Sequence, residues 1–275
     1  MRNTGSTWIW IGCAAVLSAS GFEARAQDES VKAVIVRSQG TIFLGMTIWE
    51  DLNSGWSAFG DVPVEIDYTT LGGYGWGLPE IEATGADVLV LSNPAFLTYS
   101  AAEILAVKQY VESGHGLIIS YGKFRSEDRA LAPLVGLSES IRLGTGTSTD
   151  PLQFELKVPD HPLFGGLDQP YVSGVPYSAW PYPGPWEFDG GVVLADKYTV
   201  VTPAQPGIVA RETIAYRGLY FSHYIEAKSG GTNQQDMQVF YNGLVWTGTP
   251  EPASALFLLI GSVFLTCRRA ATRHG

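Results

Sequence analysis

The central part of this chain lacks cysteine. The 275-residue sequence holds two cysteines, Cys13 and Cys267, and both lie in the apolar segments near the two ends. The region between them therefore has no thiol. This absence excludes disulfides, cysteine-ligated zinc and a cysteine nucleophile from the central region.

Basic residues are also scarce. Of the 17 Lys and Arg, five lie in the first 26 or the last 26 residues, whereas only two of the 27 Asp and Glu do. Residues 27–249 thus keep 12 basic and 25 acidic side chains, a formal charge of −13. Such an acidic surface repels nucleic acid, so we expect no nucleic-acid partner.

Signals for a metal or a nucleotide cofactor are missing as well. No His, Asp or Glu cluster has the spacing of metal ligands. The glycine-rich stretch Gly72 to Gly77 follows a predicted strand, but no adequate helix with the third glycine in register follows it. We expect neither a metal site nor a cofactor.

The first 26 residues have the three zones of a secretory signal peptide. Arg2 supplies a positive charge, Trp8 to Ala19 is uncharged, and Ala24 and Ala26 place small residues where signal peptidase reads. The alternative is a retained N-terminal anchor. We predict cleavage by signal peptidase and a mature chain that begins at Gln27.

The last 26 residues also have three parts in a fixed order. These are Pro250, Glu251 and Pro252, then the uncharged stretch Ala253 to Cys267, and then Arg268, Arg269 and Arg273. A helix over the uncharged stretch would span about 22 Å, short of a hydrocarbon core of about 30 Å. The basic end predicts a cytoplasmic C-terminus and an ectodomain outside. A plain membrane anchor is one reading of this pattern.

The order of motif, short apolar helix and arginine cluster resembles the PEP-CTERM sorting signal of Gram-negative bacteria. This resemblance implies cleavage by the membrane protease exosortase and an association with exopolysaccharide and biofilm export. It also implies a chain held transiently at the inner membrane and then found at the cell surface or outside the cell. We divide the chain into a signal peptide (1–26), an ectodomain (27–249) and a sorting tail (250–275).

Apolar runs predict buried strands in the first half of the ectodomain. They cover Val31 to Val36, Val62 to Tyr68, Asp87 to Leu91 and Leu117 to Ser120. Between the last two, Ser100 and Glu103 form a capping box that begins a helix, and Gly114 ends it. Strand, helix and strand at this spacing predict a parallel pair joined by a crossover helix.

The second half is less regular. Strands are expected at Leu152 to Val158, Val192 to Ala195, Gly207 to Arg211 and Gly218 to His223, with the last three antiparallel, and a helix from Asn233 to Trp246 closes the domain. The segment Tyr171 to Phe188 is rich in aromatic residues and proline and is expected to be irregular.

Several segments together resemble the class I glutamine amidotransferase-like superfamily, especially its trehalose-utilisation-type branch. They are Asp87 to Leu91, Tyr110 to Ile119, Asp160 to Leu167, Gly218 to Ser222 and Asn242 to Trp246. The resemblance implies an α/β, flavodoxin-like three-layer sandwich with a mainly parallel central sheet and a more antiparallel second half.

The chain departs from this family at its reactive residue. Amidotransferases place a cysteine on the turn after the strand that is Leu117 to Ser120 here, and this turn has none. Cysteine-dependent amidotransferase activity is therefore excluded. Ser120 is a substitute nucleophile only if His161 or His223 acts as its base, and the glycine that precedes a serine in a nucleophile elbow is missing. A structural serine at a strand end, and a His161 that only makes hydrogen bonds in its turn, are the alternatives.

The aromatic segment contains the best predicted ligand-binding residues. Trp180, Tyr182 and Trp186 offer ring faces that stack on sugar rings, and Glu187 is a nearby carboxylate. The alternative is that these aromatic rings pack an irregular loop. Two functions follow: a non-catalytic domain that binds carbohydrate outside the cell, and, as the alternative, a hydrolytic or sugar-modifying enzyme that uses Ser120 with His161 or His223.

Overall fold

The computed structural model describes residues 30–36, 47–92, 99–121, 124, 128–147, 150–167, 170–174, 177–181, 185–200, 203–228 and 234–249. Two predicted features lie outside these ranges: the signal cleavage site at Ala24 and Ala26, and the sorting tail with Pro250, Glu251, Pro252, Arg268 and Arg269. Among the described residues, no helix is both long and apolar enough to cross a membrane.

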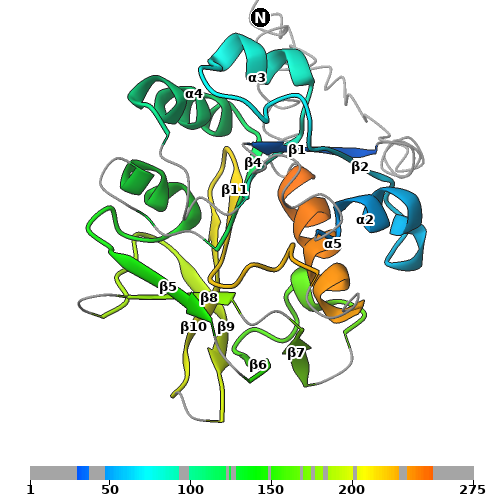
Figure 1. Cartoon of the computed structure of the whole chain (residues 1–275), viewed down its shortest axis with the longest axis vertical. Coiled ribbons are helices and arrows are strands. Elements are labelled where there is room, and N and C mark those ends of the chain that lie inside the picture. Colours follow the sequence, from blue (N-terminus) through cyan, green and yellow to red (C-terminus); the bar gives the residue numbers. More distant parts are fainter. Residues whose placement is uncertain are drawn as a thin grey trace, which may run out of the picture.

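One large sheet organises the described part of the chain. Its strands are β1 (Val31–Val36), β2 (Val64–Asp67), β3 (Val88–Ser92), β4 (Gly116–Ser120), β6 (Leu152–Leu156), β7 (Tyr171–Ser173), β9 (Val192–Tyr198), β10 (Gln205–Glu212) and β11 (Arg217–Phe221). They lie in the order β2-β1-β3-β4-β11-β10-β9-β6-β7 (Figure 1). The strands from β2 to β11 in this order are parallel, and the strands from β10 to β7 are antiparallel to their neighbours.

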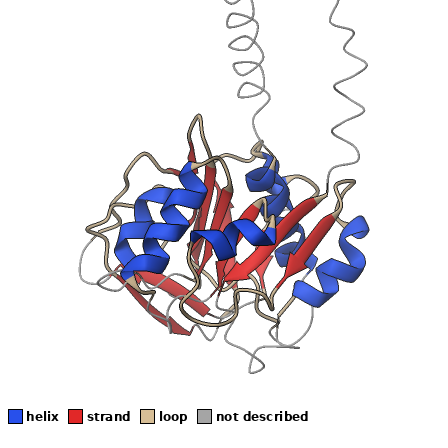
Figure 2. Ribbon diagram, turned by 90° about the horizontal axis from the view of Figure 1, so that it is seen from above, coloured by secondary structure: helices blue, strands red, loops and turns tan. Residues whose placement is uncertain are grey.

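Helices cover both faces of the sheet and complete three layers (Figure 2). The helices are α2 (Trp49–Gly55), α3 (Leu78–Thr84), α4 (Ala101–Glu112) and α5 (Gln234–Gly248), with the short 3₁₀ helices η2 (Trp56–Ala58), η3 (Asp128–Val135) and η4 (Pro162–Phe164). The core on one face contains apolar residues of α2 and α5, and the core on the other contains those of α3, α4 and η3. Side chains alternate between these cores along a strand: Ile118 enters the first and Ile119 the second.

The predicted fold class is confirmed, and so is its central crossover. β3 and β4 are parallel neighbours, paired from Val88 with Gly116 to Ser92 with Ser120. The helix between them begins where the capping box predicts, since the Ser100 hydroxyl accepts from the Glu103 N–H at 3.3 Å. The carboxylate of Glu103 accepts in turn from the Ser100 N–H at 2.7 Å.

Some elements were not expected from the sequence. Helix α3, which has seven residues, begins directly after Gly77, where the sequence predicted no helix adequate for a dinucleotide-binding motif. Pro79 lies in the first turn of this helix, where the missing N–H of proline has no partner to lose. The segment expected to be irregular contains β7 and also β8 (Tyr177–Pro181), which pairs with β5 (Leu143–Thr147) in a separate two-stranded sheet.

Two glycines allow helices to approach the centre of the sheet. A Cβ atom at Gly116 would lie 2.5 Å from the carbonyl oxygen of Thr247, at the end of α5. A Cβ atom at Gly218 would collide with the carbonyl oxygen of Leu134, in η3 on the other face. The pair β4 and β11 can therefore be covered closely from both sides only because these positions have no side chain.

Glu103 gives a test of this part of the fold. Its side chain is buried, and besides Ser100 it accepts from the N–H of Gly75 at 2.9 Å, which holds the glycine-rich loop against α4. We expect Glu103→Ala to lower the free energy of unfolding by about 2–3 kcal/mol, because two backbone donors lose their acceptor. Urea denaturation measures the change. The control is Glu112→Ala, an exposed residue of the same helix, which should change stability by less than about 0.5 kcal/mol; equal losses would contradict the assignment.

Candidate functional site

The carboxyl ends of the central parallel strands meet at one edge of the sheet, which we call the carboxyl edge. Ser92 ends β3, and it lies beside Ser120, which ends β4 and in turn pairs with Phe221 at the end of β11. Ligands of open α/β sheets bind beyond this edge. The polar residues gathered there are therefore the first candidates for a functional site.

The turn after β4 contains a strained residue. Tyr121 has φ +55°, and it is the one described residue other than glycine with a positive φ. Its N–H donates to the carbonyl of Phe221 at 2.9 Å, which continues the parallel ladder. The ring of Tyr121 stacks on Tyr224, with 6.0 Å between centroids and an interplanar angle of 23°. Such left-handed non-glycine residues cluster at functional sites.

Ser120 is the last residue of β4, the strand end that the sequence predicted, and it is fully buried. The left-handed conformation falls one residue later, on a tyrosine. Among the described residues, no hydrogen bond joins Ser120 to a histidine, so the structure provides no serine–histidine pair there.

A buried carboxyl group lies next to Ser120 instead. Glu226 follows β11 and has no exposed surface, and its Oε2 accepts from the indole Nε1 of Trp49 at 2.8 Å. The carbonyl of Glu226 also accepts from the N–H of Ile48 at 2.9 Å. Both the side chain and the backbone of Glu226 therefore hold the start of α2 against the chain after β11. The Ser120 hydroxyl is close enough to influence the carboxyl group, but neither its Oγ nor Oε1 of Glu226 forms a hydrogen bond of good geometry.

Burial raises the pKa of Glu226 from 4.5 to about 7, and the hydroxyl of Ser120, the indole of Trp49 and the hydroxyl of Ser92 oppose this shift. Its carboxyl group therefore holds or releases a proton near neutral pH, as a general acid or base must. No signal in the sequence pointed to this residue. Its partner Trp49 lies 177 residues away in the sequence, and the two residues meet only in the folded chain.

His223 lies on a different side of β11 from the strained turn. Its ring is buried among Phe154, Tyr171 and Phe221, and its Nε2 lies 3.2 Å from the hydroxyl of Tyr171. The Tyr171 hydroxyl donates to Oδ1 of Asp236 at 2.6 Å, so it must accept from a hydrogen on His223 Nε2. Nδ1 of His223 has no hydrogen-bond partner.

The charge state of this cluster argues for a structural role. Burial and the positive charge of Lys197 lower the pKa of His223 to about 3, so the ring is neutral at neutral pH. Asp236 also accepts from the Ser173 hydroxyl and the Gly174 N–H, both at 3.0 Å. The cluster thus joins the first turn of α5 to the β7 region.

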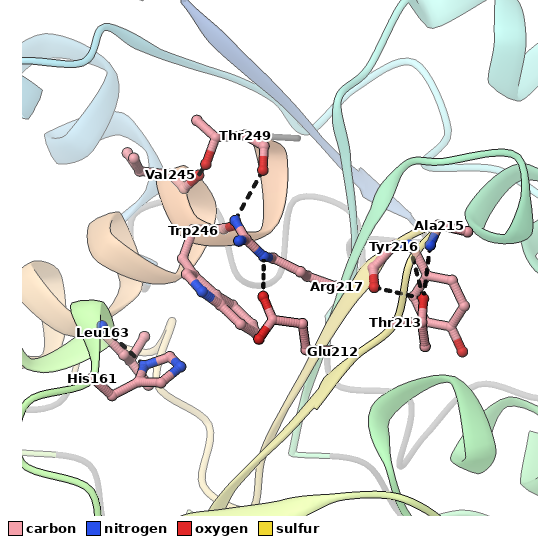
Figure 3. A network of polar contacts seen from close by, with 10 residues as sticks. All are labelled: His161, Leu163, Glu212, Thr213, Ala215, Tyr216, Arg217, Val245, Trp246 and Thr249. Atoms are coloured by element: carbon pink, nitrogen blue, oxygen red, sulfur yellow. Dashed lines mark hydrogen bonds and ion pairs between the residues drawn. The ribbon is translucent and has the colours of Figure 1, made fainter. Parts of the chain in front are cut away.

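His161 lies at the opposite, amino edge of the sheet (Figure 3). It precedes η4, and its Nδ1 accepts from the N–H of Leu163 at 3.1 Å, the hydrogen-bonding role considered from the sequence. Its ring contacts the ring of Trp246 in α5. The guanidinium of Arg217, the first residue of β11, lies over the same Trp246 ring. Ser120 is the last residue of β4, whereas Arg217 is the first residue of the parallel strand β11. His161 therefore lies at the opposite edge of the sheet from Ser120 and cannot act as its base.

The predicted carbohydrate-binding residues are only partly described. Trp180 lies in β8 and pairs with Gly144, while the placement of its side chain and all of Tyr182 lie outside the described structure. Trp186 is half-buried and packs edge-on against Tyr220, with centroids 6.2 Å apart. Glu187 is exposed, and its carboxylate accepts from the Ser140 hydroxyl. Carbohydrate binding by these residues stays a prediction.

Within the ranges that the structure describes, no three His, Cys, Asp or Glu side chains gather closely enough to hold a metal ion.

Solved structures share this architecture. A cytoplasmic protein from Salmonella typhimurium superposes with a TM-score of 0.51 at 15% identity, over 80% of this chain and 99% of its own. A ThuA-like protein from Bacteroides uniformis superposes with a TM-score of 0.53 at 16% identity, over 78% of this chain and 90% of its own. A ThuA-like protein from Parabacteroides merdae gives 0.51 at 11% identity, over 80% and 91%.

The fold is therefore that of ThuA-like proteins, which is glutamine amidotransferase-like and of the flavodoxin type. No protein-family model matches the chain, and a comparison with curated protein sequences found no match.

Glu226 gives a pH-dependent prediction. Because its pKa is higher in the folded than in the unfolded chain, the native state keeps a proton that the unfolded state has lost between pH 4.5 and about 7. Stability due to this group therefore falls as pH rises through that window. Glu226→Gln cannot ionise and keeps an oxygen for Trp49. We expect the variant to gain about 3 kcal/mol relative to the native protein between these two pH values.

The measurement is urea denaturation of both proteins at a series of pH values. The difference between them is the useful quantity, because His161 and His223, whose pKa values are lowered, change stability in the opposite direction in part of this range. A difference that stays constant from pH 4.5 to 7 would show that Glu226 does not titrate there.

Proposed function

We propose that this chain is an exported protein of the bacterial envelope whose ThuA-like domain binds a carbohydrate at the carboxyl edge and performs no thiol chemistry. The observation that carries the proposal is Tyr121. It occupies the left-handed turn after β4, near the position where amidotransferases place a cysteine, and its ring stacks on Tyr224. The strained turn is present, but its residue is a tyrosine whose ring is 5% exposed and packs against Tyr224, which is 4% exposed.

The chemistry around this turn suits a neutral, hydroxyl-rich ligand. Aromatic rings pack on the C–H faces of sugars, and carboxyl and hydroxyl groups exchange hydrogen bonds with sugar hydroxyls. Tyr121 and Tyr224 form a small, nearly buried cluster apart from the two cores, and the carboxyl group of Glu226 lies close to Tyr224. The formal charge of −13 on residues 27–249 disfavours a phosphate-rich ligand.

The placement of the chain ends fixes how a tethered domain would be oriented. Val31 begins the described domain and Gly248 ends α5, and a Cβ atom at Gly248 would lie 2.6 Å from the Val31 side chain. Both ends therefore leave at the amino edge. A domain tethered through its Pro-Glu-Pro tail then turns its carboxyl edge away from the membrane, toward external polysaccharide.

An acid–base enzyme is the second candidate function. One observation favours it: Glu226, with a pKa near 7, lies beside Ser120 at the strand ends. In this alternative, Glu226 replaces the histidines as the proton acceptor for Ser120. The distinction is measurable, because binding needs the aromatic pair whereas hydrolysis needs the serine.

The binding proposal is tested on a glycan array. We expect Tyr121→Asn to weaken binding by about 10-fold, because the stacked pair with Tyr224 that shapes the turn is lost while asparagine tolerates the left-handed backbone. Ser120→Ala should bind as the native protein does. The control is Tyr74→Asn, which changes a tyrosine that is 73% exposed on the glycine-rich loop. Unchanged binding by Tyr121→Asn refutes the site, and loss of a sugar hydrolysis in Ser120→Ala favours the enzyme.

The sorting proposal is tested by the intact mass of the protein recovered from a bacterium that has exosortase. We expect a product that begins at Gln27 and lacks the residues after the Pro-Glu-Pro motif. Deleting the exosortase should leave the tail in place. A native product that keeps residues 253–273 contradicts processing, although it leaves membrane anchoring intact.

A further inference from the structure

A pocket of about 430 Å³ lies at the amino edge, on the far side of the sheet from Tyr121. Its walls come from the turn before η4, the end of β10, the start of β11 and the last turns of α5. The lining residues are His161, Pro162, Glu212, Arg217, Asn242, Val245, Trp246 and Thr249. Its volume falls in the range of small-molecule sites.

Arg217 forms a rigid wall of this pocket (Figure 3). Its Nε donates to Oε1 of Glu212 at 2.8 Å, and its Nη1 donates to the carbonyls of Trp246 and Thr249, both at 3.0 Å. The carbonyls at a helix C-terminus carry a partial negative charge and favour a cation. The guanidinium therefore closes the end of α5 and is held in place by several hydrogen bonds.

His161 contributes a hydrogen-bond donor of known tautomer. A backbone N–H can only donate, so the bond from Leu163 requires Nδ1 of His161 to be the unprotonated nitrogen. The hydrogen of the neutral ring is then on Nε2. Burial and the nearby charge of Arg217 lower the pKa of His161 to about 4, so the ring stays neutral at neutral pH.

The net charge of the pocket is zero. His161 is neutral, and the positive charge of Arg217 is matched by Glu212. The Glu212 side chain is half-exposed, and a carboxylate with one oxygen bonded to Arg217 can still accept further hydrogen bonds. The pocket therefore presents a fixed donor and a fixed acceptor without a charge to attract an ion.

The pocket does not suit an aromatic ligand. The guanidinium carbon of Arg217 lies over the Trp246 ring, 5.1 Å from its centroid, and His161 contacts the same ring at 4.9 Å. Trp246 is only 7% exposed, so it has little free face for stacking a nucleobase. Recognition must come from hydrogen bonds to His161 and Glu212.

We propose that this pocket is a second ligand site, for a single neutral sugar unit, in which one hydroxyl accepts from His161 Nε2–H and a hydroxyl donates to Glu212. A hydroxyl group satisfies both partners because it donates and accepts, and a sugar unit carries several hydroxyl groups on one small neutral ring. The site is independent of the carboxyl edge and shares no residue with it.

The test uses the full-length protein with ¹⁵N-labelled histidine, in a detergent whose headgroup is not a sugar. Glucose and N-acetylglucosamine are the probes, added separately up to about 50 mM. We expect at least one of them to shift the Nε2 signal of His161 in a saturable manner and to leave the signals of His115 unchanged. Sodium sulfate at equal concentration is the anion control and should cause no saturable shift.

Two variants define the contacts. Glu212→Gln should weaken sugar binding by about 10-fold, while Glu155→Gln, another exposed carboxylate on a strand that is paired with a cation, should not. His161→Asp keeps a cap for the Leu163 N–H and removes the donor, so binding followed by calorimetry should be lost. No shift with either sugar, or equal affinity in Glu212→Gln, overturns the proposal. Tyr121→Asn should leave this binding unchanged, which separates its outcome from that of the carboxyl edge.

Discussion

The parallel pairing of β4 with β11 is the constraint on which the rest of the structure depends. It joins the parallel half of the sheet to the antiparallel half, although residues 117–120 and 218–221 are far apart in the chain. Bringing such distant segments together has a large entropic cost, which burial of both strand faces must offset. Once Ser120 is level with Phe221, the chain that leaves each strand reaches the same edge, and Tyr121 meets Tyr224.

The sequence predicts those parts of the fold whose signals are local. The apolar run of β1 and the capping box of α4 lie within one element each, so their bounds were nearly right. Strands β5, β7 and β8 were missed because their stability comes from partners. Leu143 to Thr147 contains two glycines and has no apolar alternation, and it is a strand only because Tyr177 to Pro181 lies beside it.

The site is less predictable than the fold for the same reason. The lack of cysteine in the central region could be read directly, and it excludes cysteine-dependent amidotransferase activity there. The end of β4 at Ser120 was predicted too, but the left-handed backbone of Tyr121 was not, because this conformation is uncommon for residues other than glycine. The burial of Glu226 was also not predictable, because a glutamate after a strand is usually solvated and here distant residues such as Trp49 and Ser120 surround it.

The two edges of the sheet differ in how well their polar groups are satisfied. At the amino edge, Arg217 has acceptors for its donors and Glu212 has a partner, so little free energy is lost. At the carboxyl edge, Tyr121 has a costly backbone conformation and Glu226 is buried with one oxygen lacking a hydrogen bond. An apolar side chain at the position of Glu226 would avoid that desolvation cost. A fold that keeps both costs at the edge where α/β proteins bind ligands gains nothing in stability from them, and this favours the carboxyl edge as the principal functional site.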